Sequence, residues 1–270
     1  MYGSEETDLV VKYYDLAFGI SGESEVGWYL DKVKTFGGPV LDLACGTGRL
    51  AIIIAKEGFE VTAIDSSKGM LHVFEQNLLK SSSSVQDRIR IDRQNMTGFN
   101  LDRKFNTIIC CDAFFHNLTL EEEILCLDKI AAHLAPRGVF VFNLPNPSCE
   151  FIVKASKNKM ENFEERGCFD IDDKQGSLLV EQANIGNPSL QTITTKLRIK
   201  RFDQNGDLIE EGESGWTTRY LFQYEAVHLL YRCGFEIKKL VGDYKDGPVK
   251  QGSQLVFEAK LRKQGKEKII

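Results

Sequence analysis

The strongest constraint on this chain is a regular alternation of short apolar runs and helical patterns through its first half. Five runs have the length and composition of buried strands: 39–44, 59–64, 88–92, 105–111 and 139–144. Helical patterns separate them, for example over residues 48–57 and after the candidate N-cap residues Ser66 and Ser67. Strands that alternate with helices predict right-handed crossovers and a parallel sheet, which is the α/β class.

A capping-box pattern marks the start of the last helix in this series. Thr119 precedes Glu122 by three residues, so each side chain can bond to the backbone amide of the other. The apolar residues that follow share a helical period and predict a buried stripe: Ile124, Leu127, Ile130 and Leu134. We expect Pro136 and Gly138 to end this helix before the fifth strand.

The pattern changes after residue 145. Residues 146–223 lack the strand–helix alternation, and Thr192–Phe202 alternates between apolar and polar side chains, as a half-buried antiparallel strand does. Asn205-Gly206 is a hairpin turn signal. We therefore predict an inserted antiparallel layer with a helix near residues 150–165.

The end of the chain returns to the first pattern, with a helix expected over residues 224–233 and strands at 235–242 and 253–261. The predicted organisation is a core of residues 1–145 and 224–262. Residues 146–223 form an inserted subdomain that acts as a lid, an oligomer contact or both. We expect the last residues to form a frayed tail.

The composition excludes several classes of protein. Of 270 residues, 34 are Lys or Arg and 39 are Asp or Glu, and this net charge of −5 argues against nucleic-acid binding. The densest apolar run, Leu50–Ala55, is too short to span a membrane, and the first ten residues lack a signal-peptide pattern. Seven scattered cysteines, of which only Cys110 and Cys111 are close, predict reduced thiols, no metal site and a cytoplasmic protein.

Two glycines follow the first predicted strand, in the turn Ala44-Cys45-Gly46-Thr47-Gly48. Glycine permits positive φ and lets a ligand approach the backbone amides, and the following helix N-terminus adds partial positive charge. Such a pair is often only a tight turn. Here, however, Asp42 lies inside the strand and Asp65 ends the next strand, which favours a ligand-binding loop.

Asp65 has the position of an acid that binds both ribose hydroxyls of an adenosine cofactor, although it could also simply favour a helix N-terminus. Two cofactor classes compete. A nicotinamide dinucleotide suits the G-x-G-x-x-A pattern of residues 46–51, but Asp42 would lie close to its pyrophosphate. S-adenosylmethionine carries an ammonium and a sulfonium, and an acid below the loop suits these cations.

Val40–Leu50 (VLDLACGTGRL) and Val61–Leu71 (VTAIDSSKGML) resemble the first two motifs of class I S-adenosylmethionine-dependent methyltransferases. The resemblance covers residues 40–145 and resumes at 224–261. It is strongest to the small-molecule branch, which includes glycine and amino-sugar N-methyltransferases. It implies a Rossmann-like, doubly wound, seven-stranded sheet whose last strand is antiparallel, combined here with the antiparallel β insertion.

The resemblance also implies a set of cofactor-binding residues. One group would surround the methionine part of the cofactor: Asp42, Ala44, Cys45, Gly46 and Gly48. Asp65 would bind the ribose, and Ser66 and Met70 would flank the adenosine. Asn95 stands where the family often has an acid that binds the adenine amino group, and its side-chain carbonyl can still accept one hydrogen bond.

Three further cofactor contacts have structural alternatives. Met96 would pack on the adenine ring and Cys111 would line the sulfonium region, unless both are ordinary core residues. Tyr13-Tyr14-Asp15 resembles a segment of small-molecule members in which a tyrosine covers the cofactor, and we expect Tyr14 to be that residue. The alternative is an aromatic face that docks the N-terminal helix.

Methyl transfer from a sulfonium depends mainly on alignment in a dry pocket, and a general base is needed only if the nucleophile arrives protonated. The family often has a histidine where His116 stands, so His116 is the candidate catalytic residue. The alternative is a structural histidine that is bonded to the backbone. Candidate substrate contacts are Phe114 in the same loop and a cluster in the insertion: Trp216, Arg219 and Tyr220. Hairpin packing is the alternative for that cluster.

The sequence thus predicts a methyltransferase that uses S-adenosylmethionine to methylate a nitrogen or oxygen of a small soluble metabolite. It predicts binding to neither nucleic acid nor membrane, with the insertion as a candidate homo-oligomer contact. An NAD-dependent dehydrogenase and a non-catalytic S-adenosylmethionine-binding protein are the alternatives.

Overall fold

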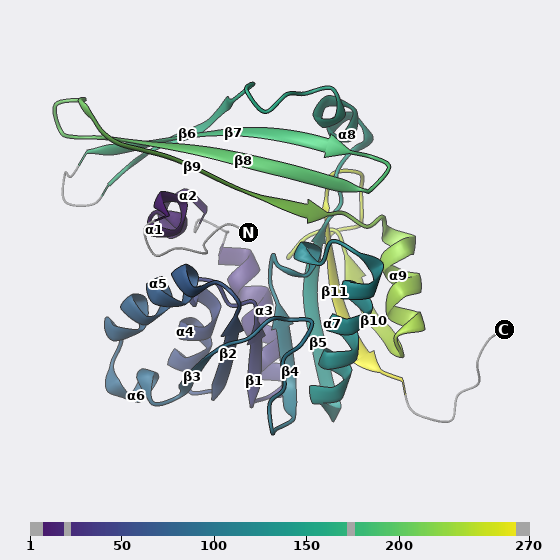
Figure 1. The fold of residues 1–270 in the computed structure, drawn as a ribbon. Helices are drawn as coiled ribbons and strands as arrows, with labels where there is room; N and C mark the ends of the chain where they lie inside the picture. The colour runs from purple at the N-terminus through teal and green to yellow at the C-terminus, as the bar shows by residue number, and fades with distance from the viewer. Residues whose placement is uncertain (1–7, 19–22, 172–175, 263–270) are drawn as a thin grey trace.

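The computed structural model describes residues 8–18, 23–171 and 176–262, which form two β-sheets (Figure 1). The larger sheet has strand order β10-β11-β5-β4-β1-β2-β3, and the smaller has the order β6-β7-β8-β9. The smaller sheet lies across one end of the larger one. The predicted α/β fold with a separate antiparallel layer is confirmed, whereas most of the predicted C-terminal tail, 263–270, lies outside the described residues.

Five neighbouring strands of the larger sheet are parallel: β1 (Val40–Leu43), β2 (Val61–Asp65), β3 (Ile89–Arg93), β4 (Phe105–Cys110) and β5 (Leu134–Pro145). The sheet is completed by β10 (Phe235–Val241) and β11 (Gln254–Leu261), and β11 pairs antiparallel with both β10 and β5. Because β2 and β4 lie on opposite sides of β1, the connections diverge there. Such a switch opens a crevice beyond the carboxyl ends of the strands.

Helices cover both faces of this sheet: α3 (Glu23–Phe36), α4 (Arg49–Lys56), α5 (Lys68–Leu79), α6 (Ser83–Gln86), α7 (Leu120–His133) and α9 (Gln223–Arg232). Tyr29, Ile54 and Phe74 pack α3, α4 and α5 on one face. Leu127 and Leu230 pack α7 and α9 on the other. All these side chains are buried, so apolar stripes hold the helices in place. Within the described ranges, none of the helices has the length and apolar character needed to cross a membrane.

The predicted capping box of Thr119 and Glu122 is confirmed at the start of α7. The predicted end of this helix was wrong. The helix stops at His133, and the backbone is already extended at Leu134, which pairs with β4. Pro136 and Gly138 therefore lie inside β5 and do not end the helix, because strand pairing ends it first.

The second sheet consists of β6 (Glu164–Asp170), β7 (Ser177–Asn187), β8 (Thr192–Phe202) and β9 (Leu208–Arg219). Helix α8 (Cys149–Ser156) packs against β7. Each neighbouring pair of strands is antiparallel. The predicted alternation of β8 is confirmed, since Leu197 and Ile199 are fully buried. The helix predicted near residues 150–165 is observed as α8, which ends at Ser156, and strand β6 begins at Glu164.

The N-terminal helices α1 (Leu9–Lys12) and α2 (Tyr14–Phe18) lie beneath the second sheet (Figure 1). Val10 and Ala17 share a core cluster with Leu197. These helices, grouped with the core in the sequence analysis, thus pack against the insertion.

Gly48 is the N-cap of α4 and has φ +79°, and a Cβ there would lie 2.1 Å from the ring of Phe74. We expect Gly48→Ala to lower the free energy of unfolding by about 2–4 kcal/mol, through backbone strain and overpacking. Gly58→Ala is the control, because Gly58 has φ +93° but no atom within 4 Å of a Cβ, and it should cost only about 1–2 kcal/mol. Urea unfolding measures both losses, and equal losses would contradict the packing argument.

Candidate functional site

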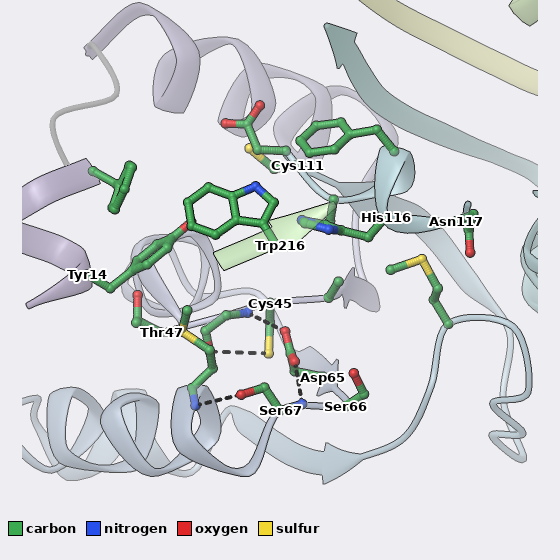
Figure 2. Close-up of a pocket in the computed structure, with 18 of the residues that line it drawn as sticks. Tyr14, Cys45, Thr47, Asp65, Ser66, Ser67, Cys111, His116, Asn117 and Trp216 are labelled. Atoms are coloured by element: carbon green, nitrogen blue, oxygen red, sulfur yellow. Dashed lines mark hydrogen bonds between the residues drawn. The ribbon is translucent and has the colours of Figure 1, made fainter. Parts of the chain in front are cut away.

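A cavity of about 780 Å³ lies between the carboxyl ends of the central strands and the second sheet (Figure 2). Most predicted site residues line it: Tyr14, Asp42, Ala44, Cys45, Gly46, Asp65, Ser66, Met70, Asn95, Met96, Cys111, His116 and Trp216. Four predicted residues do not line it: Gly48, Phe114, Arg219 and Tyr220. Gly48 instead has the N-cap role described above.

The three predicted substrate contacts that lie outside the cavity have partners elsewhere in the structure. Phe114 is buried in the core, where its ring centroid lies 5.3 Å from that of Phe142. Arg219 forms an ion pair with Glu123 of α7. Tyr220 is buried in a small cluster with residues of α8. Each side chain is engaged in packing or pairing away from the cavity.

Asp65 connects β2 to the glycine loop and to the start of α5. Its Oδ2 accepts a hydrogen bond from the amide of Gly46 (2.9 Å), and its Oδ1 accepts one from the amide of Ser67 (2.8 Å) (Figure 2). The Ser67 hydroxyl in turn caps α5 at the amide of Met70. Burial raises the pKa of Asp65, and the backbone bonds oppose this rise. A carboxylate has about four lone-pair sites, so it can still accept hydrogen bonds from a ligand.

Two non-glycine residues with left-handed backbone flank the crevice. Ala44 follows β1 with φ 57°, and Asp112 follows β4 with φ 48°. Asn143 fixes Asp112, because its Oδ1 accepts from the Asp112 amide (2.8 Å) and its Nδ2 donates to the Asp112 carboxylate (2.5 Å). Such backbone conformations cost free energy and cluster at functional sites.

Asp42 is a buried acid with an incomplete set of partners. It is 2% exposed and accepts a hydrogen bond from the amide of Ala51, but its Oδ2 has no partner among the described residues. Burial raises the pKa of Asp42 to about 7, while Arg49 opposes the rise and Asp65 adds to it. An unpaired buried polar atom costs roughly 1–3 kcal/mol, which favours a ligand group beside this oxygen.

Helix α3 contributes a buried acid that the sequence analysis missed. Glu25 pairs with Arg49 (Oε2 to Nη2, 3.1 Å), and its Oε1 accepts hydrogen bonds from the Cys111 thiol (3.1 Å) and the Tyr244 hydroxyl (3.3 Å). Arg49 lines the cavity, and its buried Nη1 has no partner in the described part of the chain. The floor of the cavity therefore has an unpaired acceptor in Asp42 and an unpaired donor in Arg49.

Ligand atoms of Glu25, Cys111 and Asp112 lie within 4.8 Å of one another. The guanidinium of Arg49 is already the cation beside Glu25. Burial also raises the pKa of the Cys111 thiol, and a protonated thiol is a poor metal ligand. We assign no metal to this cluster.

Ser66, Met70, Asn95 and Met96 line the part of the cavity where an adenosine is expected. The Oδ1 of Asn95 already accepts hydrogen bonds from the amide and the hydroxyl of Thr97, both at 2.9 Å. A carbonyl oxygen has two lone pairs, so a bond to an adenine amino group requires Asn95 to turn from Thr97. Met96 both packs on the core and lines the cavity.

His116 and Trp216 come from the opposite wall of the cavity (Figure 2). His116 forms a hydrogen bond with the backbone of Thr217 in β9. Burial lowers the pKa of His116 to about 4, and this bond only partly opposes it. The ring is therefore neutral at neutral pH, and a neutral imidazole has one nitrogen that donates and one that accepts. His116 is thus bonded to backbone and lines the cavity as well.

Tyr14 reaches the cavity from α2, whose Phe18 connects it to the second sheet. The ring centroids lie 5.1 Å apart for Tyr14 and Phe18, and 6.0 Å apart for Phe18 and Trp216. Asp15 fixes this helix to the glycine loop, since its carboxylate accepts a hydrogen bond from the Thr47 hydroxyl (2.6 Å). These aromatic side chains form the roof of the cavity.

Comparisons with known proteins agree with this geometry. A family model described as "Methyltransferase domain" matches residues 40–138. The chain is 30% identical over 228 residues to "Putative methyltransferase YqeM" of Bacillus subtilis (strain 168). The aligned region covers 84% of this chain and 85% of that protein.

Two solved structures share the fold over nearly the whole chain. An S-adenosylmethionine-dependent methyltransferase from Clostridium acetobutylicum ATCC 824 has a TM-score of 0.75 at 20% identity, covering 94% of this chain and 97% of that one. SAM-bound CalS10, an amino pentose methyltransferase from Micromonospora echinaspora, has a TM-score of 0.66 at 17% identity, covering 92% and 96%. The chain belongs to the methyltransferase family, and its fold is that of S-adenosylmethionine-dependent methyltransferases.

Proposed function

We propose that this enzyme transfers a methyl group from S-adenosylmethionine to a nitrogen or oxygen of a small soluble metabolite. The observation that carries the proposal is the roofed cavity of about 780 Å³, a volume typical of small-molecule sites. The structural neighbour CalS10 is described as an amino pentose methyltransferase, which supports a small acceptor. A cytoplasmic location, self-association through the second sheet and the division into core and insertion stay predictions.

The floor of the cavity suits the charges of S-adenosylmethionine, which carries a sulfonium, an α-ammonium and an α-carboxylate. Within the described ranges, Asp42 Oδ2 is a buried acceptor and Arg49 Nη1 a buried donor without partners, which matches a zwitterionic amino-acid group. A nicotinamide dinucleotide would instead place its pyrophosphate near Asp42. Family membership and this charge pattern both argue against the dehydrogenase alternative.

We assign Asp65 to the ribose hydroxyls, by analogy with other adenosine-binding sites at strand ends. The remaining cofactor contacts follow the walls of the cavity. The methionine side comprises Ala44, Cys45, Gly46 and Cys111, and the adenosine side comprises Ser66, Met70, Asn95 and Met96.

When bound, S-adenosylmethionine would supply a methyl group on a sulfonium: the acceptor lone pair would form the new bond to carbon, the carbon–sulfur electron pair would return to sulfur as a neutral thioether, and the displaced N–H or O–H proton would leave to solvent with the product. The residues of the chain exclude water and orient the acceptor. Tyr14 and Trp216 close the roof, and neutral His116 accepts a hydrogen bond from the acceptor. Alignment of this kind lowers a barrier by up to about 7–11 kcal/mol.

Calorimetry with S-adenosylmethionine and S-adenosylhomocysteine tests cofactor binding. Transfer of a labelled methyl group to a panel of small amines and hydroxyl compounds tests catalysis. Binding together with a labelled product supports the proposal. Binding without transfer to any member of the panel would favour the non-catalytic alternative, and absence of binding would reject both.

We expect Asp65→Ala to weaken S-adenosylhomocysteine binding by roughly ten- to a hundredfold for each ribose bond lost, since bonds to a charged group contribute about 1.5–3 kcal/mol. A 2′,3′-dideoxy analogue separates this role from the bonds that Asp65 makes to Gly46 and Ser67. The wild type should prefer the hydroxylated ligand, and the variant should bind both ligands equally by calorimetry. A variant that keeps the preference would contradict the ribose assignment.

His116 should act as a hydrogen-bond acceptor and not as a general base. We expect His116→Asn to lower kcat about two- to tenfold, the effect of one neutral hydrogen bond, and not by the ~10²–10⁴ of a general base. His72→Asn, at an exposed position on α5, is the control and should match the wild type. Rates measured across pH 5–8 should show no inflection near pH 6.5 from His116, because its pKa is lowered to about 4. A larger loss with such an inflection would show that His116 is a base.

The proton on Asp42 should report cofactor binding. A cation beside Asp42 lowers its pKa from about 7 in the free protein, so binding of S-adenosylmethionine should release protons at neutral pH. Because the free form binds more protons, affinity should rise with pH up to about 7 and then level off. Calorimetry in buffers of different ionisation enthalpy measures the release, which Asp42→Asn should abolish. Equal release by this variant would assign the proton to another group.

A further inference from the structure

Most charged groups in the wall of the cavity have partners within the protein: Asp15 with Thr47, Arg49 with Glu25, Asp65 with Gly46, and Glu122 with the amides of Leu118 and Thr119. Arg166 of β6 differs from them. It lines the cavity, but it forms no salt bridge with any residue of the described ranges, 8–18, 23–171 and 176–262.

Arg166 lies at the rim of the roof, where its guanidinium contacts two neutral side chains. Its guanidinium lies 4.3 Å from the centroid of the Phe18 ring, and its Nη1 donates to the side-chain oxygen of Gln182 at 3.2 Å. Partial burial lowers the pKa of Arg166, and the nearby Tyr14 opposes this. The cation is thus partly desolvated, and its neighbours in the described part of the chain include the aromatic face of Phe18, the amide oxygen of Gln182 and Tyr14.

The roof connects Arg166 to His116 through a continuous series of contacts. Phe18 lies between Arg166 and Trp216, with ring centroids of Phe18 and Trp216 6.0 Å apart. The next residue of β9, Thr217, is bonded to His116. A ligand that follows the roof therefore meets a cation at one end, aromatic surface in the middle and a hydrogen-bond acceptor at the other end.

The floor of the cavity has the opposite character. Asp42, Asp65 and Asp112 line it, and its Arg49 is paired with Glu25. An anionic group on the acceptor is repelled by these acids and attracted by Arg166. The charge distribution therefore favours one orientation of an anionic acceptor, with its negative end at the rim.

We propose that the methyl acceptor carries an anionic group, a carboxylate or a phosphate, which Arg166 binds while His116 accepts a hydrogen bond from the nitrogen or oxygen to be methylated. The paired N–H groups of a guanidinium match both anions. The aromatic surface between the two ends suits a flat or apolar segment in the acceptor. This inference rests on the proposed function and names its substrate class.

The test uses benzoate, phenyl phosphate and benzamide, three probes that share a ring and differ in charge. Each is titrated by calorimetry into the protein saturated with S-adenosylhomocysteine. We expect benzoate or phenyl phosphate to bind at least tenfold more tightly than benzamide, and the tighter of the two identifies the anion. Arg166→Gln should abolish the difference and Arg166→Lys should retain part of it. Arg90→Gln, at an exposed position of β3 outside the cavity, should behave as the wild type.

Equal binding of the three probes to the wild type would overturn the inference, as would a preference for the anions that survives in Arg166→Gln. Titration of S-adenosylhomocysteine separates this inference from the proposed function. Arg166→Gln should bind it as the wild type does, so loss of anion binding alone concerns the acceptor side. Failure of the wild type to bind it would mean that the proposed function is wrong, and the probes would then be titrated into the protein alone.

Discussion

The hydrogen bonds of the Asp65 carboxylate organise the site. One oxygen holds the amide of Gly46 in the loop after β1, and the other holds the amide of Ser67 at the start of α5. Strand β2, the glycine loop and a capped helix are thereby fixed together at the point where the connections diverge from β1. Because the protein itself provides these bonds, this wall is formed before a ligand binds, and the binding free energy is not spent on ordering the loop.

The parts of the fold that were predictable from the sequence are those that local patterns determine. The alternation of β8 and the capping box of α7 are examples, since each depends on residues a few positions apart. The end of α7 was not predictable, because the pairing of Leu134 with a strand distant in sequence decides it. The position of α1 and α2 likewise depends on a long-range contact, in which Val10 and Ala17 meet Leu197 of the second sheet.

The same distinction divides the site. The floor was largely predictable because its motif residues lie in short segments at strand ends, but Glu25 was not, since it contacts Cys111 across 86 residues of sequence. The roof was predicted less well. Trp216 faces the cavity, whereas Arg219, an odd number of positions along the same strand, points to α7, as the alternation of a strand requires. Arg166 occurs in a mixed charge run with no periodic signal.

Floor and roof therefore respond differently to sequence change. A substitution at Asp65 disturbs two backbone bonds and the loop that they hold, so the floor has little freedom to vary. Arg166 lies on the edge strand β6 and is exposed, so replacing it costs little packing. Acceptor preference can change through such rim residues while cofactor binding is retained. This physical separation explains why the motifs identify the reaction, whereas evidence about the acceptor comes from tertiary contacts of the roof.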